Sequence, residues 1–315
     1  MQLVWSIDDL NLRDVWLTIG SFDGVHKGHQ ALLGQLTAGA RRDSVPAVAL
    51  TFHPHPAVVL GKRPDFTYLT SPEERAALLG EHGVDVVIVH PFSRQVAELE
   101  ASEFIARLHA HLHMQRLCVG HDFALGRGRK GDIHTLEQLG REFGYRLDLV
   151  PVMQLDGEVV SSSQVRLALS AGDVGRASLL LGRPYRVDGE VVRGDGRGRT
   201  IGIPTANLAV WAGRLLPKPG VYACTARLDG EDWNAVTNIG YRPTFEGQPP
   251  FPQVEAHLLD FDRDLYNQRL SLAFVARLRE EQRFPGVAAL VEQIHRDIGR
   301  AREILNSSSG SKEVK

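Results

Sequence analysis

The sequence predicts two domains: an α/β domain with a Rossmann-like parallel sheet, then an antiparallel β-barrel that ends in an α-helix. Three observations lead to this fold class. At 315 residues the chain is about twice the usual domain length. Strand-like and helix-like segments alternate up to about residue 181. Beyond that point several short strand-like segments follow one another without intervening helices.

The first half alternates strands and helices in the manner of a parallel sheet covered on both faces. A helical stripe places Leu32, Leu33, Leu36 and Ala40 on one face of a helix over 29–41. Ser71 and Glu74 form a capping box that starts another helix. Ligands bind such sheets at the carboxyl ends of the strands. The expected strands are 15–19, 47–52, 84–89, 116–119 and 146–152, and further helices are expected over 104–112 and near 136–139.

The second half changes to short strands separated by Gly, Pro and Asp turns, which is typical of a barrel. We expect strands at 186–193, 221–228, 233–239, 254–259 and 270–278, and a helix over 287–305. The predicted domains are therefore residues 1–183 and 184–306. Residues 307–315 are rich in Ser, Gly and Lys and are predicted to be a disordered tail.

The composition is that of an ordinary globular protein, with 36 basic and 38 acidic residues and a net charge of −2. This balance argues against binding nucleic acid by phosphate neutralisation, and it leaves small phosphorylated ligands open. No apolar run is long enough to cross a membrane and no signal peptide is visible, so we expect a cytoplasmic protein. Cys118 and Cys224 stand far apart in apolar runs, which predicts buried thiols rather than a redox pair. The sequence indicates no oligomeric state.

A glycine-rich turn follows the first expected strand and runs from Gly20 to His29. Glycines there let the backbone approach a phosphate, and a helix N-terminus offers free N–H groups. His26 and His29 share one face if the helix has begun, so both imidazoles could hydrogen-bond the same phosphate. The spacing is neither a Walker A loop nor Gly-x-Gly-x-x-Gly. A zinc site completed by His53 or His55, or a turn with incidental histidines, remains an alternative.

A second anion site is indicated by the run of serines from Ser161 to Ser163, with Arg166 three residues later. Hydroxyls at a helix start and a nearby guanidinium suit a phosphate. Taken alone, the serines would fit a plain helix cap.

The stretch from Arg193 to Asn207 combines glycines and arginines and then continues into Pro204-Thr205-Ala206-Asn207. Such a loop can wrap an anion with its backbone, or it can be a simple hairpin. In a later strand Glu255 stands between Val254 and Ala256, and a carboxylate there needs a partner or a task. A rim glutamate paired with an arginine is the alternative.

These motifs resemble those of a known family. The first resembles the nucleotidylyltransferase signature, which here is His26-x-Gly28-His29 after the turn Gly20-x-Phe22-Asp23-Gly24. Its usual partner, a serine-rich helix start followed by an arginine, is matched by Ser162, Ser163 and Arg166. The segments 52–56 and 119–126 are similar to loops of the adenylyltransferase module of bacterial bifunctional riboflavin kinase/FAD synthetases. Pro204-Thr205-Ala206-Asn207 resembles the riboflavin kinase signature. The resemblance spans roughly residues 15 to 300, with the motifs in the family's order.

The resemblance implies a bifunctional enzyme. The barrel phosphorylates riboflavin with Mg·ATP to give FMN and ADP, and the first domain transfers AMP from ATP to FMN to give FAD and pyrophosphate. The implied catalytic residues are His26, His29, Arg166 and Glu255, and Thr205 and Asn207 hold Mg²⁺. The implied binding residues are Gly20, Phe22, Asp23, Gly24, Gly28, His55, Asp122, Phe123, Ser162, Ser163, Gly194, Gly196, Arg197, Gly198, Thr205 and Asn207.

Three points stay open from the sequence. The basic loop Arg127 to Asp132 is either a phosphate clamp or a solvated turn. One module could be inactive, or the chain could be a flavin-binding regulator without turnover.

Overall fold

A computed structural model describes residues 1–63, 65–194, 196–241 and 252–309. Contacts between Cα atoms divide the chain into two compact units, Met1–Ser162 and Ser163–Lys315. Each unit is described by itself.

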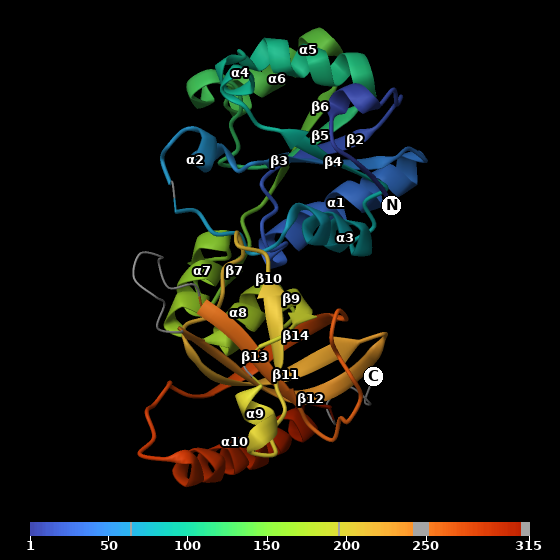
Figure 1. Cartoon of the computed structure of the whole chain (residues 1–315). Helices are drawn as coiled ribbons and strands as arrows, with labels where there is room; N and C mark the ends of the chain where they lie inside the picture. The colour runs from blue at the N-terminus through green and yellow to red at the C-terminus, as the bar shows by residue number, and fades with distance from the viewer. Residues whose placement is uncertain (64, 195, 242–251, 310–315) are drawn as a thin grey trace. The chain divides into compact units, whose positions relative to one another are not determined.

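The first unit is built on a six-stranded, fully parallel sheet in the order β1-β4-β3-β2-β5-β6 (Figure 1). The prediction of a parallel sheet is confirmed. The edge strand β1 was not predicted, because only three residues of it pair with β4. The strands are β1 (Gln2–Val4), β2 (Trp16–Ile19), β3 (Ala47–His53), β4 (Val86–Pro91), β5 (Arg116–Gly120) and β6 (Arg146–Val150).

Helices cover both faces of this sheet (Figure 1). On one face, α1 (Lys27–Asp43) and α3 (Pro72–Glu81) pack Leu36 and Leu79 against Ala49 and Val87. On the other, α5 (Ala101–Leu112) and α6 (Ile133–Phe143) join a second cluster with the alternate residues of the same strands. The predicted capping box starts α3, because Ser71 and Glu74 exchange hydrogen bonds with each other's backbone N–H. The short elements are α2 (Pro56–Val59), α4 (Arg94–Glu98) and the hairpin of β7 (Gln154–Leu155) and β8 (Glu158–Val159).

The second unit contains a closed antiparallel barrel in the order β10-β13-β12-β11-β14-β9, with β10 also paired to β9. The barrel prediction is confirmed. The strands are β9 (Tyr185–Val192), β10 (Ala206–Val210), β11 (Gly220–Leu228), β12 (Glu231–Tyr241), β13 (Pro252–Leu258) and β14 (Arg269–Arg279), and the helices are α7 (Ser162–Ala171), α8 (Val174–Leu181), α9 (Arg197–Thr200) and α10 (Val287–Ser309).

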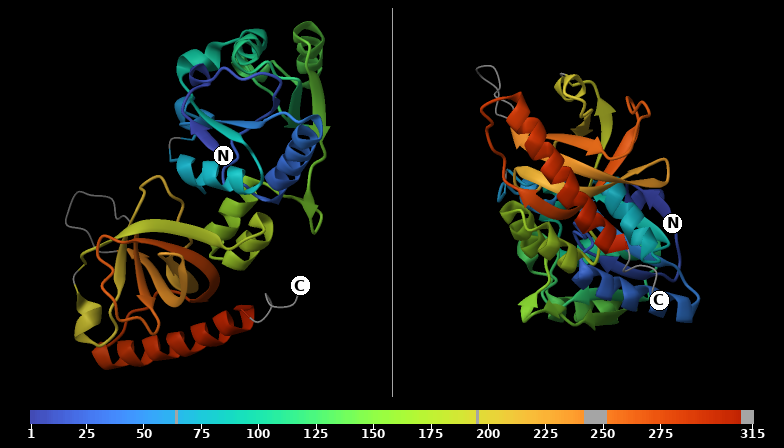
Figure 2. Two further views of the ribbon diagram at one scale, coloured as in Figure 1. Left: turned by 90° about the vertical axis from the view of Figure 1, so that its right-hand side faces the viewer. Right: turned by 90° about the horizontal axis from the view of Figure 1, so that it is seen from below.

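Helix α10 lies across the outside of the barrel (Figure 2). Its Ala301 and Leu305 pack against Val221 and Leu278, and Arg279 forms a 2.8 Å ion pair with Asp297. The tail prediction is wrong for residues 307–309, which belong to α10; the Ser307 hydroxyl donates to the Glu303 carbonyl one turn earlier. Residues 310–315 lie outside the described residues.

Helix α8 packs against β9 and β14, which is why the contacts group α8 with the barrel. The domain boundary after residue 183 stays a prediction.

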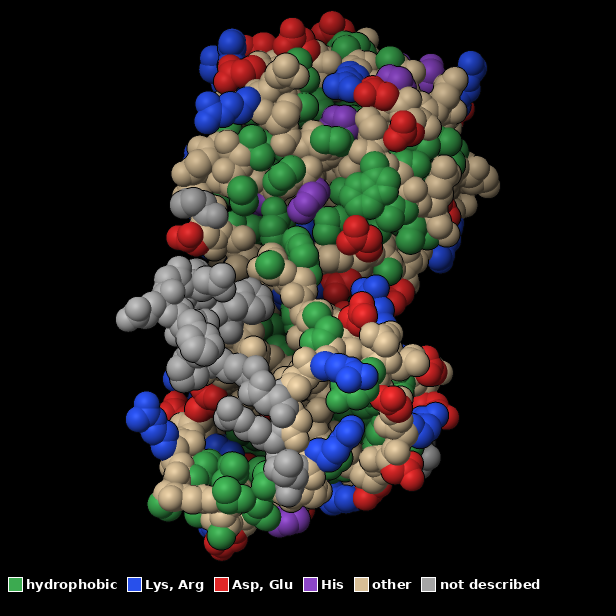
Figure 3. All heavy atoms as spheres, in the orientation of Figure 1, with side chains coloured by type: hydrophobic (Ala, Val, Ile, Leu, Met, Phe, Trp, Pro, Cys, Tyr) green, Lys and Arg blue, Asp and Glu red, His purple; other side chains and the backbone are tan. Residues whose placement is uncertain are grey.

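Across the part of the chain that the structure describes, no helix combines the length and apolarity needed to span a membrane. Acidic and basic side chains are interspersed on the face shown in Figure 3, which agrees with the small net charge. The cytoplasmic location stays a prediction. Both cysteines are buried and unpaired, as predicted, and burial raises the pKa of each thiol to about 12.

Candidate active sites

The two histidines of the first motif lie together at the start of α1. His26 is the N-cap residue, and its Nδ1 accepts a hydrogen bond from the His29 backbone N–H at 3.3 Å. The two imidazole rings stack with centroids 3.6 Å apart and an angle of 18° between their planes. Nδ1 of His26 is therefore engaged by the backbone at the start of the helix.

The turn before α1 is tightly folded. Phe22, Gly24 and Val25 have φ of 46°, 82° and 42°, and this left-handed region is unfavourable for a branched residue such as Val25. A Cβ on Gly28 would lie 3.1 Å from the His26 ring, so glycine lets the ring rest on the helix. Gly20 has the same role toward Phe22, because a Cβ there would lie 2.9 Å from the Phe22 ring.

Asp23 was expected to contact the ligand, but its carboxylate is buried and serves the protein. It accepts hydrogen bonds from the backbone N–H groups of Leu69 and Thr70 and from the Thr70 hydroxyl, all at 3.0–3.1 Å. The Asp23 carbonyl accepts a 2.9 Å hydrogen bond from the Ser162 hydroxyl. Ser162 therefore fastens the histidine turn to the end of the first unit.

His29 has an unusual environment. The pKa of His29 lies well below the ordinary 6.5, chiefly because the ring is buried and further because of His26 and the Arg75 cation. The ring is therefore neutral at pH 7. The Nδ1 of His29 is buried without a hydrogen-bond partner. A neutral ring can donate one hydrogen bond to a phosphate and carries no charge to be desolvated.

The loop after β3 arranges aromatic and imidazole rings side by side. His55 caps α2, with its Nδ1 accepting from the Ala57 N–H at 3.1 Å, and its ring stacks on Phe66 with centroids 4.3 Å apart. The backbone N–H of His55 donates a hydrogen bond to the Tyr68 hydroxyl at 2.9 Å. No three His, Cys, Asp or Glu side chains among the described residues are grouped to hold a metal ion, so the zinc alternative has no support.

The loop after β5 has fewer features that indicate a binding site. Asp122 is exposed, and Phe123 packs against the hydrophobic core rather than standing free. Arg127 forms an ion pair with Glu100, and Arg129 donates a hydrogen bond to the Asp122 carbonyl at 2.7 Å. Both exposed arginines therefore have partners within the protein. This arrangement favours a turn over a phosphate clamp.

Ser163 and Arg166 lie on α7, beyond the division of the chain after Ser162. Their contact with the triphosphate stays a prediction.

In the second unit, glycines make room for the side chains of the Thr-Ala-Asn motif. A Cβ on Gly194 would lie 2.3 Å from Nδ2 of Asn207, and one on Gly198 would lie 3.3 Å from Oγ1 of Thr205. The loop therefore closes directly over these two side chains, whose hydroxyl and amide oxygens are the hard ligands that Mg²⁺ prefers. Gly196 has φ of 70° and caps α9, and the side chain of Arg197 lies outside the described residues.

The barrel register places Glu255 between two amides. Glu255 of β13 is directly opposite Asn207 of β10 on one side and Asn238 of β12 on the other. Directly opposed residues point to the same face, with Cβ atoms about 5 Å apart. Asn238 is not among the site residues predicted from the sequence, because no spacing in the sequence connects it to Glu255. The following residues 242–251 lie outside the described part of the chain.

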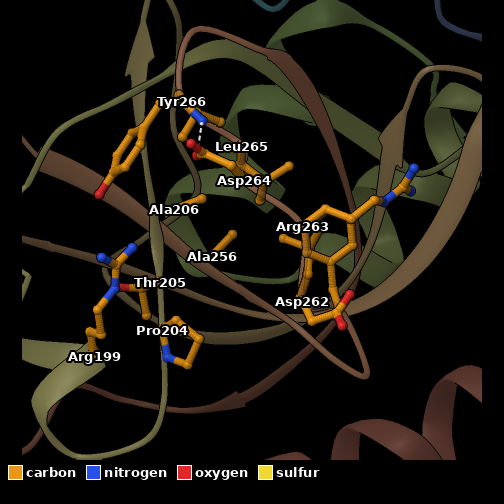
Figure 4. A pocket seen from close by; sticks show the side chains of 13 residues that line it. Arg199, Pro204, Thr205, Ala206, Ala256, Asp262, Arg263, Asp264, Leu265 and Tyr266 are labelled. Carbon is orange, nitrogen blue, oxygen red and sulfur yellow. Dashed lines mark hydrogen bonds between the residues drawn. The ribbon is translucent and has the colours of Figure 1, made fainter.

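A cavity of about 400 Å³ is lined by Thr205, Ala206 and Ala256 (Figure 4). Ala206 and Ala256 alternate along their strands with Asn207 and Glu255, so the cavity lies on the opposite face of this part of the barrel wall from the row. Arg199, Pro204 and Thr205 stand on one side of it and Asp262 and Arg263 on the other. The loop that carries Asp262 and Arg263 is shaped in part by Asp264, whose carboxylate accepts a hydrogen bond from the Tyr266 backbone N–H at 3.0 Å. The volume of the cavity, its position next to Thr205 and its mixed polar and apolar walls suit a nucleotide.

Comparison with known proteins gives a separate match for each half of the chain. A family model described as FAD synthetase matches residues 8–164, and one described as riboflavin kinase matches residues 181–305. The bifunctional riboflavin kinase/FMN adenylyltransferase of Pseudomonas fluorescens is 41% identical over 98% of this chain and 99% of its own length. The enzyme of the same name from Bacillus subtilis is 38% identical over 89% of each chain.

The chain belongs to the bifunctional riboflavin kinase/FMN adenylyltransferase family.

A solved structure from Streptococcus pneumoniae, titled a macrolide-efflux protein, shares 31% of its sequence and has a TM-score of 0.87 over 95% of this chain and 98% of that one. The region matched by the FAD synthetase model contains His26 and His29. The region matched by the riboflavin kinase model contains Thr205, Asn207 and Glu255. The family resemblance drawn from the motifs is confirmed.

Proposed function

We propose that the chain converts riboflavin to FMN in its second unit and FMN to FAD in its first, consuming one ATP in each reaction. The observation that supports this most is the presence of two separate phosphate-type sites, each in the half of the chain that matches the corresponding family model. The domain boundary we propose lies between residues 183 and 184.

In the adenylyl transfer, a phosphate oxygen of FMN attacks the α-phosphorus of ATP in line, and pyrophosphate leaves. No protein nucleophile is needed, so the first unit contributes positioning and charge stabilisation. His26 and His29 contact the phosphates and stabilise the charge that builds on the leaving group. Ser162, Ser163 and Arg166 hold the β- and γ-phosphates, with Ser162 also bracing the turn through Asp23.

In the phosphorylation, the Glu255 carboxylate accepts the proton of the riboflavin 5′-hydroxyl, whose oxygen attacks the γ-phosphorus while ADP leaves. Mg²⁺ arrives with ATP as part of that substrate and neutralises the triphosphate charge. Oxygens of Thr205 and Asn207 hold the metal, and the neighbouring cavity takes the nucleotide. The two amides beside Glu255 keep its carboxylate in the row that faces the reacting hydroxyl.

The test is a product assay. The full chain is incubated with riboflavin, ATP and Mg²⁺, and the flavins are separated by chromatography. We expect FMN to appear first and FAD to follow. FMN alone, or FAD only when FMN is supplied, would show a single active module, and unmodified riboflavin with bound flavin would show a non-catalytic binder.

A further inference from the structure

A buried ion pair lies beneath the histidine turn of the first unit. Arg75 of α3 and Asp23 of the turn are each only 1% exposed, and Nη2 of Arg75 is 3.7 Å from Oδ1 of Asp23. Asp23 is further held by Leu69 and Thr70. Neither the sequence motifs nor the proposed chemistry uses Arg75.

The guanidinium also reaches the end of strand β3. Its Nη1 donates to the Thr51 hydroxyl at 2.9 Å and to the Phe52 carbonyl at 3.5 Å. The Thr51 hydroxyl in turn donates to the Ser21 carbonyl at 2.9 Å. One side chain of α3 thus connects the carboxyl end of a central strand to the turn that precedes His26, directly at Asp23 and through Thr51 at Ser21.

The same cation is close to the predicted phosphate site. After burial and His26, Arg75 is the third cause of the lowered pKa of His29, and after burial it is the largest cause of the lowered pKa of His53. The titratable groups beside these side chains include His26 next to His29, Asp23 next to Arg75, and Glu73 of α3 next to His53.

A buried ion pair contributes little to stability in general, because the desolvation of both charges offsets their attraction. The location of this pair, between the histidine turn and the end of β3, indicates a role in the site above it.

We propose that Arg75 is a positioning residue for the adenylyl transfer. By tying Asp23 to Thr51 it fixes the turn so that the His26 and His29 rings stay stacked. After burial and His26, its cation also disfavours a charge on the His29 ring. This role rests on the proposed function of the first unit.

The experiment uses the full chain with Arg75→Met, Arg75→Lys and the control Arg42→Met, which changes an exposed arginine of α1. FAD formation from FMN and riboflavin phosphorylation are measured on the same preparations. The pKa of His29 is followed by NMR on protein labelled in its histidines, with His29→Asn used to assign the signal.

For Arg75→Met we expect the kcat of FAD formation to fall about a hundredfold, as misplaced reacting groups do. We also expect an unchanged riboflavin phosphorylation rate and a higher pKa for His29. Arg75→Lys keeps the charge and loses the forked contacts, so it should keep the low His29 pKa and recover part of the rate. Arg42→Met should match the unaltered chain in every measurement.

An unaltered rate of FAD formation in Arg75→Met would overturn the proposal, and so would a lower rate with an unchanged His29 pKa. If Arg75→Met leaves the first unit unfolded, Arg75→Lys decides: a folded variant with the full rate contradicts the positioning role. If the unaltered chain makes no FAD, the proposed function fails instead, and the His29 pKa still tests the electrostatic part.

Discussion

Asn207 and Glu255 lie directly opposite each other on neighbouring strands of the barrel. The pair joins the amide expected to hold Mg·ATP to the carboxylate expected to accept the hydroxyl proton. Asn238 flanks Glu255 from the other side. Three adjacent strands thus place the proposed metal ligand and the proposed base at a spacing of about 5 Å between Cβ atoms. The rigidity of a barrel wall is what gives this arrangement its precision.

The first prediction concerns this carboxylate. Glu255→Gln keeps the size of the side chain and removes its capacity to accept a proton, so riboflavin phosphorylation should fall by about 10²- to 10⁴-fold. FMN supplied to the variant should still become FAD at the unaltered rate. The measurement is chromatographic detection of both products, with Glu292→Gln on the exposed face of α10 as the control. A variant that retained its kinase rate would mean that another group takes the proton.

His29→Ala is expected to act in the opposite way. The change removes a ring that stacks on His26 and leaves the capping bond of His26 to the backbone, so the turn should persist. Loss of one donor to a developing charge costs roughly 10²- to 10³-fold in rate. FAD formation should fall by that amount while riboflavin phosphorylation continues, and His134→Ala, an exposed histidine of α6, should change neither. Loss of both activities in a folded variant would contradict the separation of the two sites.

Buried histidines predict a pH dependence of stability in the first unit. His90 is 3% exposed, its Nδ1 accepts from the Ile7 N–H, and burial lowers its pKa below the ordinary 6.5. Below pH 6.5 the unfolded chain therefore binds more protons than the folded chain, so the free energy of unfolding falls as the pH drops from 6.5 toward the folded pKa. His29 and His53 act in the same direction.

Calorimetric unfolding between pH 5 and 8 measures this slope, of which one histidine supplies at most about 1.4 kcal/mol per pH unit. His90→Gln should reduce the slope, whereas His134→Gln should leave it unchanged. An identical slope in His90→Gln would show that the pKa of this imidazole is the same in the folded and the unfolded chain.

The contacts of α8 predict which fragment of the second half is more stable. Val174, Leu180 and Leu181 are each 1% exposed, and α8 packs on β9 and β14. Each large apolar side chain removed from such a site costs about 1.5–3 kcal/mol. Residues 184–315 should still phosphorylate riboflavin, but residues 163–315 should unfold at a higher temperature. Equal unfolding temperatures would show that α8 adds nothing to the barrel.

Much of this molecule was predictable from the sequence because its strong patterns are local. The long apolar strands, the capping box at Ser71 and the terminal helix all come from residues close together in the chain. The pairing of His26 with His29 follows from their spacing at a helix start. Strands β1 and β10 escaped prediction because they are short and gain their stability from neighbours far away in sequence.

The missed site residues have the same explanation. Arg75 lies within a helix whose pattern appears ordinary, and only the folded chain brings it to Asp23 and Thr51. Asn238 reaches Glu255 through strand register, which no local spacing encodes. The hydrogen bonds from Leu69 and Thr70 to the Asp23 carboxylate are likewise not encoded by any local spacing, and the contact of Asp23 with a ligand stays a prediction.

Strand β10, which directly follows Thr205, is hydrogen-bonded on both sides, to β9 and to β13. A ring of strands closed in this way offers no unpaired row of amides on which a second chain could add a strand. The flavin-phosphorylating half is therefore a good candidate for transplantation: fused to an unrelated protein, it should resist edge-to-edge aggregation and supply FMN at the place where the fusion is localised.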